Sequence, residues 1–92
     1  MNDEIQQLCD RAKRGDVPAA SELVALHYQR IFGYFRRLSG NDADAADLTQ
    51  KTFSKAWQSL AGFQNRSSFS TWLHGIAHHT YVDWRRKLQP DE

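Results

Sequence analysis

Apolar residues recur at intervals of three and four along most of this chain, which is the periodicity of an amphipathic α-helix. Only two prolines and five glycines occur among the 92 residues, so little interrupts long helices. No segment is a convincing strand. The sequence therefore predicts an all-α fold: one domain with a modest core, built as a compact bundle of about four helices.

Helix stops and caps divide the pattern into four segments. Gly15 suits the end of the first helix, and Pro18 suits the first turn of the second. Residues 39–42, Ser-Gly-Asn-Asp, predict a helix end followed by a new N-cap, and Ser67 or Ser68 can cap the last helix. The expected helices span about residues 3–14, 18–38, 43–60 and 69–88.

Each of the last three helices carries an apolar stripe that we expect to form the core. The expected core positions are Leu23, Val24, Leu26, Ile31, Phe32, Tyr34, Phe35 and Leu38 in the second helix, Ala46, Thr49, Phe53, Ala56, Trp57 and Leu60 in the third, and Phe69, Trp72, Leu73, Ile76, Ala77, Thr80 and Trp84 in the fourth.

The third helix has a second, polar face. Asp47, Gln50, Lys51 and Ser54 are three, four and seven residues apart, so they form one compact strip. The three aspartates of residues 42–47 lie in or before the first turn, where the helix dipole favours negative charge. The net charge of the chain is only +1, so global basicity does not argue for a nucleic-acid partner.

Cysteine usage and hydropathy indicate a cytoplasmic protein. Cys9 is the single cysteine, so no internal disulfide can form and a reducing compartment is expected. Nothing at the start resembles a signal peptide. No stretch approaches the roughly 20 apolar residues that span a bilayer, so we expect no membrane insertion.

The residues give little support for catalysis. His74 and His78 are four apart on one helix face, the spacing used for zinc, but Gly75 stands where a metalloprotease needs its general base. No third ligand is near in sequence. No glycine-rich phosphate loop or nucleophile elbow occurs either. We expect no enzymatic activity, no metal and no cofactor; a metal-dependent enzyme built on the two histidines is the alternative.

The stretch from the loop at residues 61–68 to residue 87 suits nucleic acid better. The loop surrounds the aromatic Phe63 with hydrogen-bonding side chains, which is a way to hold one unstacked base. The next helix adds histidines and ends in a basic turn suited to phosphates. The same basic turn is also ordinary complementation of the helix dipole. Trp72 and Trp84 lie on the apolar stripe and fit a core, so the residues alone leave both interpretations open.

Two runs of residues carry a resemblance to a known family. The first is Asp-Leu-Thr-Gln-Lys-Thr-Phe-Ser-Lys-Ala-Trp at residues 47–57, and the second is Phe-Ser-Thr-Trp-Leu-His-Gly-Ile-Ala at residues 69–77. In this order they resemble region 2 of the extracytoplasmic-function (ECF) sigma factors, which are bacterial transcription-initiation factors. The common forms there are Asp-Leu-x-Gln-Glu-x-Phe-x-x-x-Trp and Phe-x-x-Trp-Leu-x-x-Ile-Ala. The resemblance covers about residues 17–88.

The resemblance implies a protein partner for the third helix. In the family this segment docks on the clamp helices of the β′ subunit of core RNA polymerase. The docking face would then be the polar strip with Leu48 beside it, namely Asp47, Leu48, Gln50, Lys51 and Ser54.

The resemblance also implies promoter DNA as a partner. The loop would capture a flipped base from the non-template strand of the minus-ten element, and the last helix would melt and recognise that element. The expected DNA-binding residues are Phe63, Gln64, Asn65, Arg66 and Ser67 in the loop, His78 and His79 on the helix, and Arg85, Arg86 and Lys87 in its last turn.

Two positions depart from the family pattern. Lys51 stands where the family usually has Glu, which reverses one charge on the docking face. His79 stands where the family often has Asn, so no promoter sequence is carried over. By this comparison we expect residues 1–16 to supply an N-terminal helix, residues 17–88 the region 2 core and residues 89–92 the start of a linker, with the family's second DNA-binding domain absent from this sequence.

One further alternative follows from the family. Its members are commonly held by anti-sigma factors, which cover the same surfaces. The chain could therefore act mainly as a protein-interaction module bound by such a regulator, and the sequence does not separate that role from promoter recognition.

Overall fold

The computed structural model describes residues 2–88 and confirms the all-α prediction. Four α-helices follow one another: α1 (Asn2–Lys13), α2 (Val17–Ser39), α3 (Asp42–Ser59) and α4 (Phe69–Leu88), with a short 3₁₀ turn, η1 (Leu60–Gly62), after α3. No residue of the described range is in a strand. The expected linker start at residues 89–92 lies outside the described residues.

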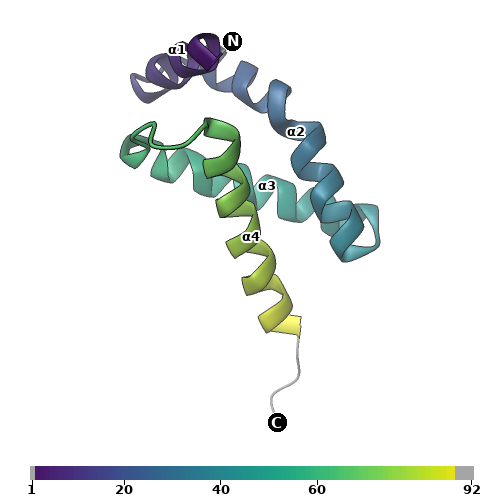
Figure 1. Ribbon diagram of the computed structural model, residues 1–92. Coiled ribbons are helices and arrows are strands. Elements are labelled where there is room, and N and C mark those ends of the chain that lie inside the picture. The colour runs from purple at the N-terminus through teal and green to yellow at the C-terminus, as the bar shows by residue number, and fades with distance from the viewer. Residues whose placement is uncertain (1, 89–92) are drawn as a thin grey trace.

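Packing is between neighbours in the chain. The helix α2 packs on both α1 and α3, and α4 packs mainly on α3. Figure 1 shows α4 crossing in front of α3, with its C-terminal half extending away from the other helices. Smaller contacts join α4 to α1 and α2. The first turns of α4 are therefore surrounded by protein, whereas its last turns are open.

The helix boundaries are set by caps, most of them at positions that the sequence predicts; the N-cap of α2 was not among them. Asp16 accepts a hydrogen bond from the Ala19 amide at 3.2 Å to start α2, and Gly40 ends it with a left-handed φ of 83°. The Asn41 side chain then accepts from the Asp44 amide at 2.8 Å to start α3. At α4 the cap is Ser68, whose hydroxyl accepts from the Thr71 amide at 3.1 Å.

Most expected core positions are confirmed, and three are wrong. Leu26 and Leu38 expose 54% and 40% of their surface, and Ala46 is also exposed. The buried positions of α2 repeat every four residues from Leu23 through Ile31 to Phe35. Leu26 lies about 100° around the helix from position 27, outside the arc that its neighbours cover. The apolar stripe of α2 is wider than the part of its surface that the neighbouring helices cover.

The tryptophans of α4 are half-buried and pack against the core rather than standing free. Three buried threonines satisfy their hydroxyls within their own helices: Thr49, Thr52 and Thr80 donate to the carbonyls four residues before them at 2.7 to 2.8 Å. No helix in the described part of the chain is long and apolar enough to cross a membrane.

Candidate polymerase and nucleic-acid surfaces

The polar strip of α3 is exposed as expected. Asp47, Gln50, Lys51 and Ser54 all lie at the surface on one side of a continuous helix. The Lys51 ammonium lies 3.0 Å from the Asp47 carboxylate, one turn away, and both side chains are about half exposed. An exposed pair of this kind contributes only about 0.3–0.5 kcal/mol to stability, but it offsets the charge of Lys51 locally.

Leu48 does not belong to this surface. It was expected beside the polar strip, but its side chain is fully buried in the core between the helices. Because it is one residue from Asp47, it is rotated by about 100° around the helix, into the core. The position that the sequence placed in the core instead, Ala46, faces out.

Phe63 is likewise a core residue rather than an exposed stacking platform. Only 3% of its surface is exposed. Its ring packs on Phe69, with centroids 5.9 Å apart, and on Trp72, at 4.9 Å. The Lys13 ammonium of α1 lies 5.5 Å from the ring centroid and also donates to the Phe63 carbonyl. Phe63 therefore anchors the loop, and its burial contradicts the prediction that Phe63 is one of the DNA-binding residues.

The other loop residues, Gln64, Asn65, Arg66 and Ser67, are exposed. Asn65 has a left-handed backbone with φ of 59°, a conformation that asparagine tolerates better than most residues. The Ser67 hydroxyl donates to the Ser68 carbonyl at 3.2 Å. The loop is thus a turned, polar segment pinned at its start by Phe63 and at its end by the Ser68 cap.

A pocket of about 300 Å³ opens between this loop and the first two helices. Its walls come from three parts of the chain: Ile5, Gln6 and Cys9 of α1, His27 of α2, and Asn65, Ser67, Ser68, Phe69 and Ser70 of the loop and α4. A smaller hollow of about 220 Å³ lies between Trp72 and residues 62–67. The pocket combines apolar walls with a few polar groups, which is the usual composition of a ligand site.

The contribution of α1 and His27 to this pocket was not predicted from the sequence. His27 is buried and sits four residues from both Leu23 and Ile31, so the buried stripe of α2 runs through it. That spacing was the available signal. Cys9 is also buried, and desolvation raises its pKa to about 11, with Lys13 opposing and Asp10 adding to the shift. Its neutral thiol forms a wall of the pocket and is poorly nucleophilic.

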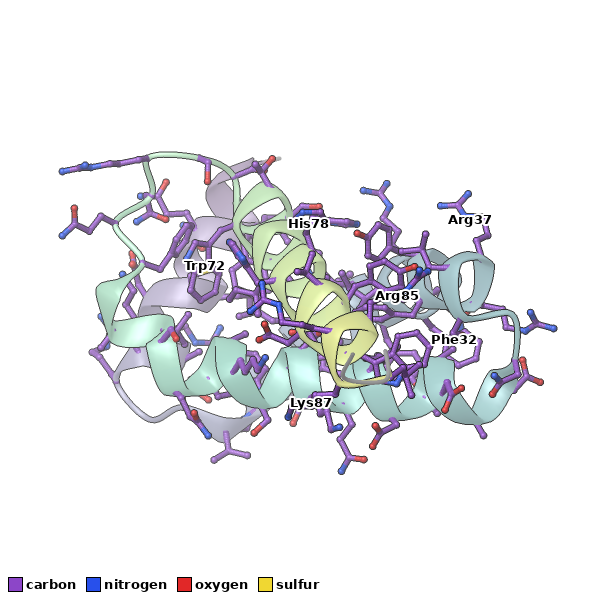
Figure 2. The ribbon with its side chains drawn as sticks, turned by 90° about the horizontal axis from the view of Figure 1, so that it is seen from below. Phe32, Arg37, Trp72, His78, Arg85 and Lys87 are labelled. Carbon is purple, nitrogen blue, oxygen red and sulfur yellow. The ribbon has the colours of Figure 1, made fainter. Side chains whose placement is uncertain are left out.

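The outer face of α4 carries the remaining predicted residues. His78 and His79 are exposed, with ring centroids 6.0 Å apart. Arg85, Arg86 and Lys87 are exposed too, and Arg85 donates to the Tyr81 hydroxyl at 3.2 Å. Figure 2 shows Arg85 and Lys87 on different sides of the helix axis, as a two-residue spacing requires. The basic turn therefore surrounds the end of α4 rather than forming a single row.

The two histidines at metal-like spacing, His74 and His78, lie in different surroundings. Nδ1 of His74 lies 2.9 Å from the Ser70 carbonyl oxygen, and the ring is half-buried in an open hollow against α2. His78 is exposed. Within residues 2–88, no three His, Cys, Asp or Glu side chains gather in a way that could hold a metal ion.

Comparison with known proteins agrees with this geometry. Residues 23–90 match the family model for sigma-70 region 2. The chain is 44% identical over 66 residues to the RNA polymerase sigma factor YlaC of Bacillus subtilis, covering 72% of this chain and 38% of that protein. It is 32% identical over 87 residues to the ECF sigma factor SigW of the same organism, covering 95% and 46%.

A third relative is the ECF sigma factor SigE of Mycolicibacterium smegmatis, 39% identical over 71 residues, which covers 77% of this chain and 27% of that protein. The chain therefore spans less than half the length of these three relatives. The fold is an all-α bundle with one polar helix face and a capped loop before its last helix, and the family model matches most of the chain. Together these observations define the class of protein. The chain belongs to the sigma-70 region 2 family, as region 2 of an ECF sigma factor.

Proposed function

We propose that this transcription-initiation domain binds core RNA polymerase through α3 and recognises and melts the promoter minus-ten element through the loop and α4. The match to sigma-70 region 2 over residues 23–90 carries the proposal. The domain would act in the cytoplasm, where it contributes binding energy and no catalytic group.

For polymerase, the proposed docking face is the exposed part of α3: Asp47, Gln50, Lys51 and Ser54. A helix with its other side committed to the core presents these groups in fixed register, which suits the clamp helices of the β′ subunit. Lys51 is neutralised locally by Asp47 at 3.0 Å, so the strip presents an internal ion pair. A complementary pair on the partner would match it.

For DNA, the proposed contacts are loop residues 64–67, His78, His79 and the basic turn at residues 85–87. Extruding a base from the duplex costs a few kcal/mol, and a prepared pocket together with phosphate contacts offsets that cost. The exposed loop lies beside such a pocket, and the arginines and lysine at the open end of α4 supply the phosphate contacts.

The test measures two bindings separately, at low salt: a β′ clamp-helix fragment, and single-stranded DNA from the non-template minus-ten strand. Asp47→Arg should weaken binding of the β′ fragment by tenfold or more while the helical circular dichroism stays unchanged, because it reverses a charge at the centre of the face. Glu22→Arg makes the same change at an exposed position of α2 and should bind like the wild type. Equal loss in both variants would remove α3 from the proposal.

A regulator is the second partner we propose, because α2 leaves Leu26 and Leu38 exposed at 54% and 40%. An anti-sigma factor that covers these side chains and the α3 strip would prevent polymerase docking. Competition between the β′ fragment and a captured regulator distinguishes the roles: simultaneous binding of both would show that the regulator does not act through these surfaces.

A further inference from the structure

The pocket between α1, α2 and the loop contains unused hydrogen-bonding capacity. The hydroxyls of its two loop serines are committed: Ser67 donates to the Ser68 carbonyl, and Ser68 donates to the Thr71 hydroxyl at 3.0 Å while it caps α4. The side-chain amides of Gln6 and Asn65 also line the pocket. Those amides, together with His27, are the groups left to recognise an occupant.

His27 is oriented by its own helix. Its Nδ1 lies 2.7 Å from the Leu23 carbonyl oxygen, and its ring meets Phe69 edge to face, with centroids 5.0 Å apart. A carbonyl oxygen only accepts, so Nδ1 must carry the proton of this bond. In the neutral ring the other nitrogen, Nε2, is then an acceptor.

The Nε2 atom keeps access to the pocket. Among the described residues, every fully buried side-chain nitrogen or oxygen has a hydrogen-bond partner. The one bond of the His27 ring is made by Nδ1, so Nε2, which has no partner, is not fully buried. His27 lines the pocket and retains 7% exposure. The floor of the pocket therefore offers one fixed acceptor beside the apolar walls of Ile5 and Phe69.

We propose that His27 is a specificity-determining residue: its Nε2 accepts a hydrogen bond from the exocyclic amino group of a nucleobase held in this pocket. Adenine carries such an amino donor at C6 and cytosine at C4, whereas C4 of thymine and uracil carries a carbonyl oxygen. That oxygen would face Nε2 with both acceptors unpaired, which is unfavourable in a buried site. The inference rests on the proposed function, in which the loop holds an extruded base.

The wild-type chain is tested against oligodeoxycytidine and oligodeoxyuridine of equal length, at low salt and mildly alkaline pH. The two bases differ at the edge that Nε2 would contact and share the same ring size. We expect cytidine to bind about three- to tenfold more tightly, the worth of one net hydrogen bond.

Three variants separate a specific role from a structural one. His27→Asn retains an amide donor near Nδ1 and loses the Nε2 acceptor, so the cytidine preference should fall to near one. His27→Gln places an amide oxygen near Nε2 and should keep the preference. His74→Asn is the matched control, since His74 makes the same bond to a carbonyl four residues before it but lines a hollow that shares no residue with the pocket.

Nitrogen-15 resonances of the wild-type rings give a second measurement that needs no variant to fold. Nε2 of His27 should shift on adding oligodeoxycytidine, and those of His74 should not. An equal affinity for both oligonucleotides, or a preference unchanged in His27→Asn, would overturn the inference while leaving the proposed function intact. Failure of both oligonucleotides to bind would overturn the proposed function as well.

Discussion

The outer face of α3 and the loop before α4 are both exposed, but they are held in place by different means. On α3 the helix backbone fixes every side chain, and the only tie within the strip is the exposed pair between Asp47 and Lys51. The loop has no regular backbone. Its shape depends on Phe63 packed beneath it, on Lys13 from another helix and on the left-handed Asn65.

This difference predicts that substitutions are tolerated better on the outer face of α3 than at the residues that anchor the loop. A residue on the α3 face can change without moving its neighbours. Lys51 is an example, since it stands where the family usually has Glu. A residue of the loop anchor cannot, because it sets the position of several others.

Phe63→Ala should have the largest effect on stability, a loss of about 3–5 kcal/mol, because it empties a buried aromatic site. Urea unfolding followed by circular dichroism measures it. Arg66→Ala, three residues away and exposed, should stay within about 0.5 kcal/mol of the wild type. If the two variants are equally stable, Phe63 is not an anchor.

Leu48→Ala tests the same contrast within α3. The loss of a fully buried leucine should cost about 2–5 kcal/mol, yet the folded fraction should bind the β′ fragment like the wild type. Gln50→Ala should do the reverse, with unchanged stability and weaker docking. Weaker docking by folded Leu48→Ala would mean that the core position shapes the docking face.

Leu48 and Phe63 also show which parts of the fold could be predicted from the sequence and which could not. The helix count, the caps at Asn41 and Ser68 and the exposed strip of α3 followed from local rules, since caps and periodicity act within a few residues. Leu48 was misplaced because the resemblance set it beside the polar strip, although one residue further along a helix points about 100° away, and Phe63 was misplaced because a loop has no periodicity from which burial can be predicted. The pocket joins residues more than 50 positions apart, Cys9 and Asn65 among them, so no local pattern predicted it.

Arg85→Ala and Arg86→Ala address the open end of α4. Each should weaken binding of single-stranded DNA and reduce the slope of log affinity against log salt by about one. Titrations across a range of salt concentrations measure the slope. Arg14→Ala, at an exposed position after α1, is the control. An unchanged slope in the α4 variants would remove these arginines from the phosphate contacts.

The smallest effect concerns the corner between α1 and α2. The Arg11 guanidinium, 2.9 Å away, and the Ala19 amide hold the pKa of Asp16 below its ordinary value. A carboxyl with a lowered folded-state pKa stabilises the fold above about pH 4, and this contribution is lost as the pH falls through the folded-state value.

Asp16→Asn keeps an N-cap acceptor but cannot titrate. Its thermal midpoint should therefore fall less steeply than that of the wild type as the pH drops below about 4. Thermal melts across this pH range measure the difference. Parallel curves for the two proteins would mean that Asp16 does not link acidity to stability.

The tie between Lys13 and Phe63 bears on where this domain should be cut for experiments. The family match begins at residue 23, inside α2, so a fragment trimmed to the match would lose α1 and the start of α2 but keep α3, the loop and α4. It would lose the ammonium that holds the loop at its carbonyl, and with it Ile5, Gln6 and Cys9 from the pocket wall. Such a fragment should still dock on polymerase while handling single-stranded DNA poorly, and the defect would come from the choice of boundary.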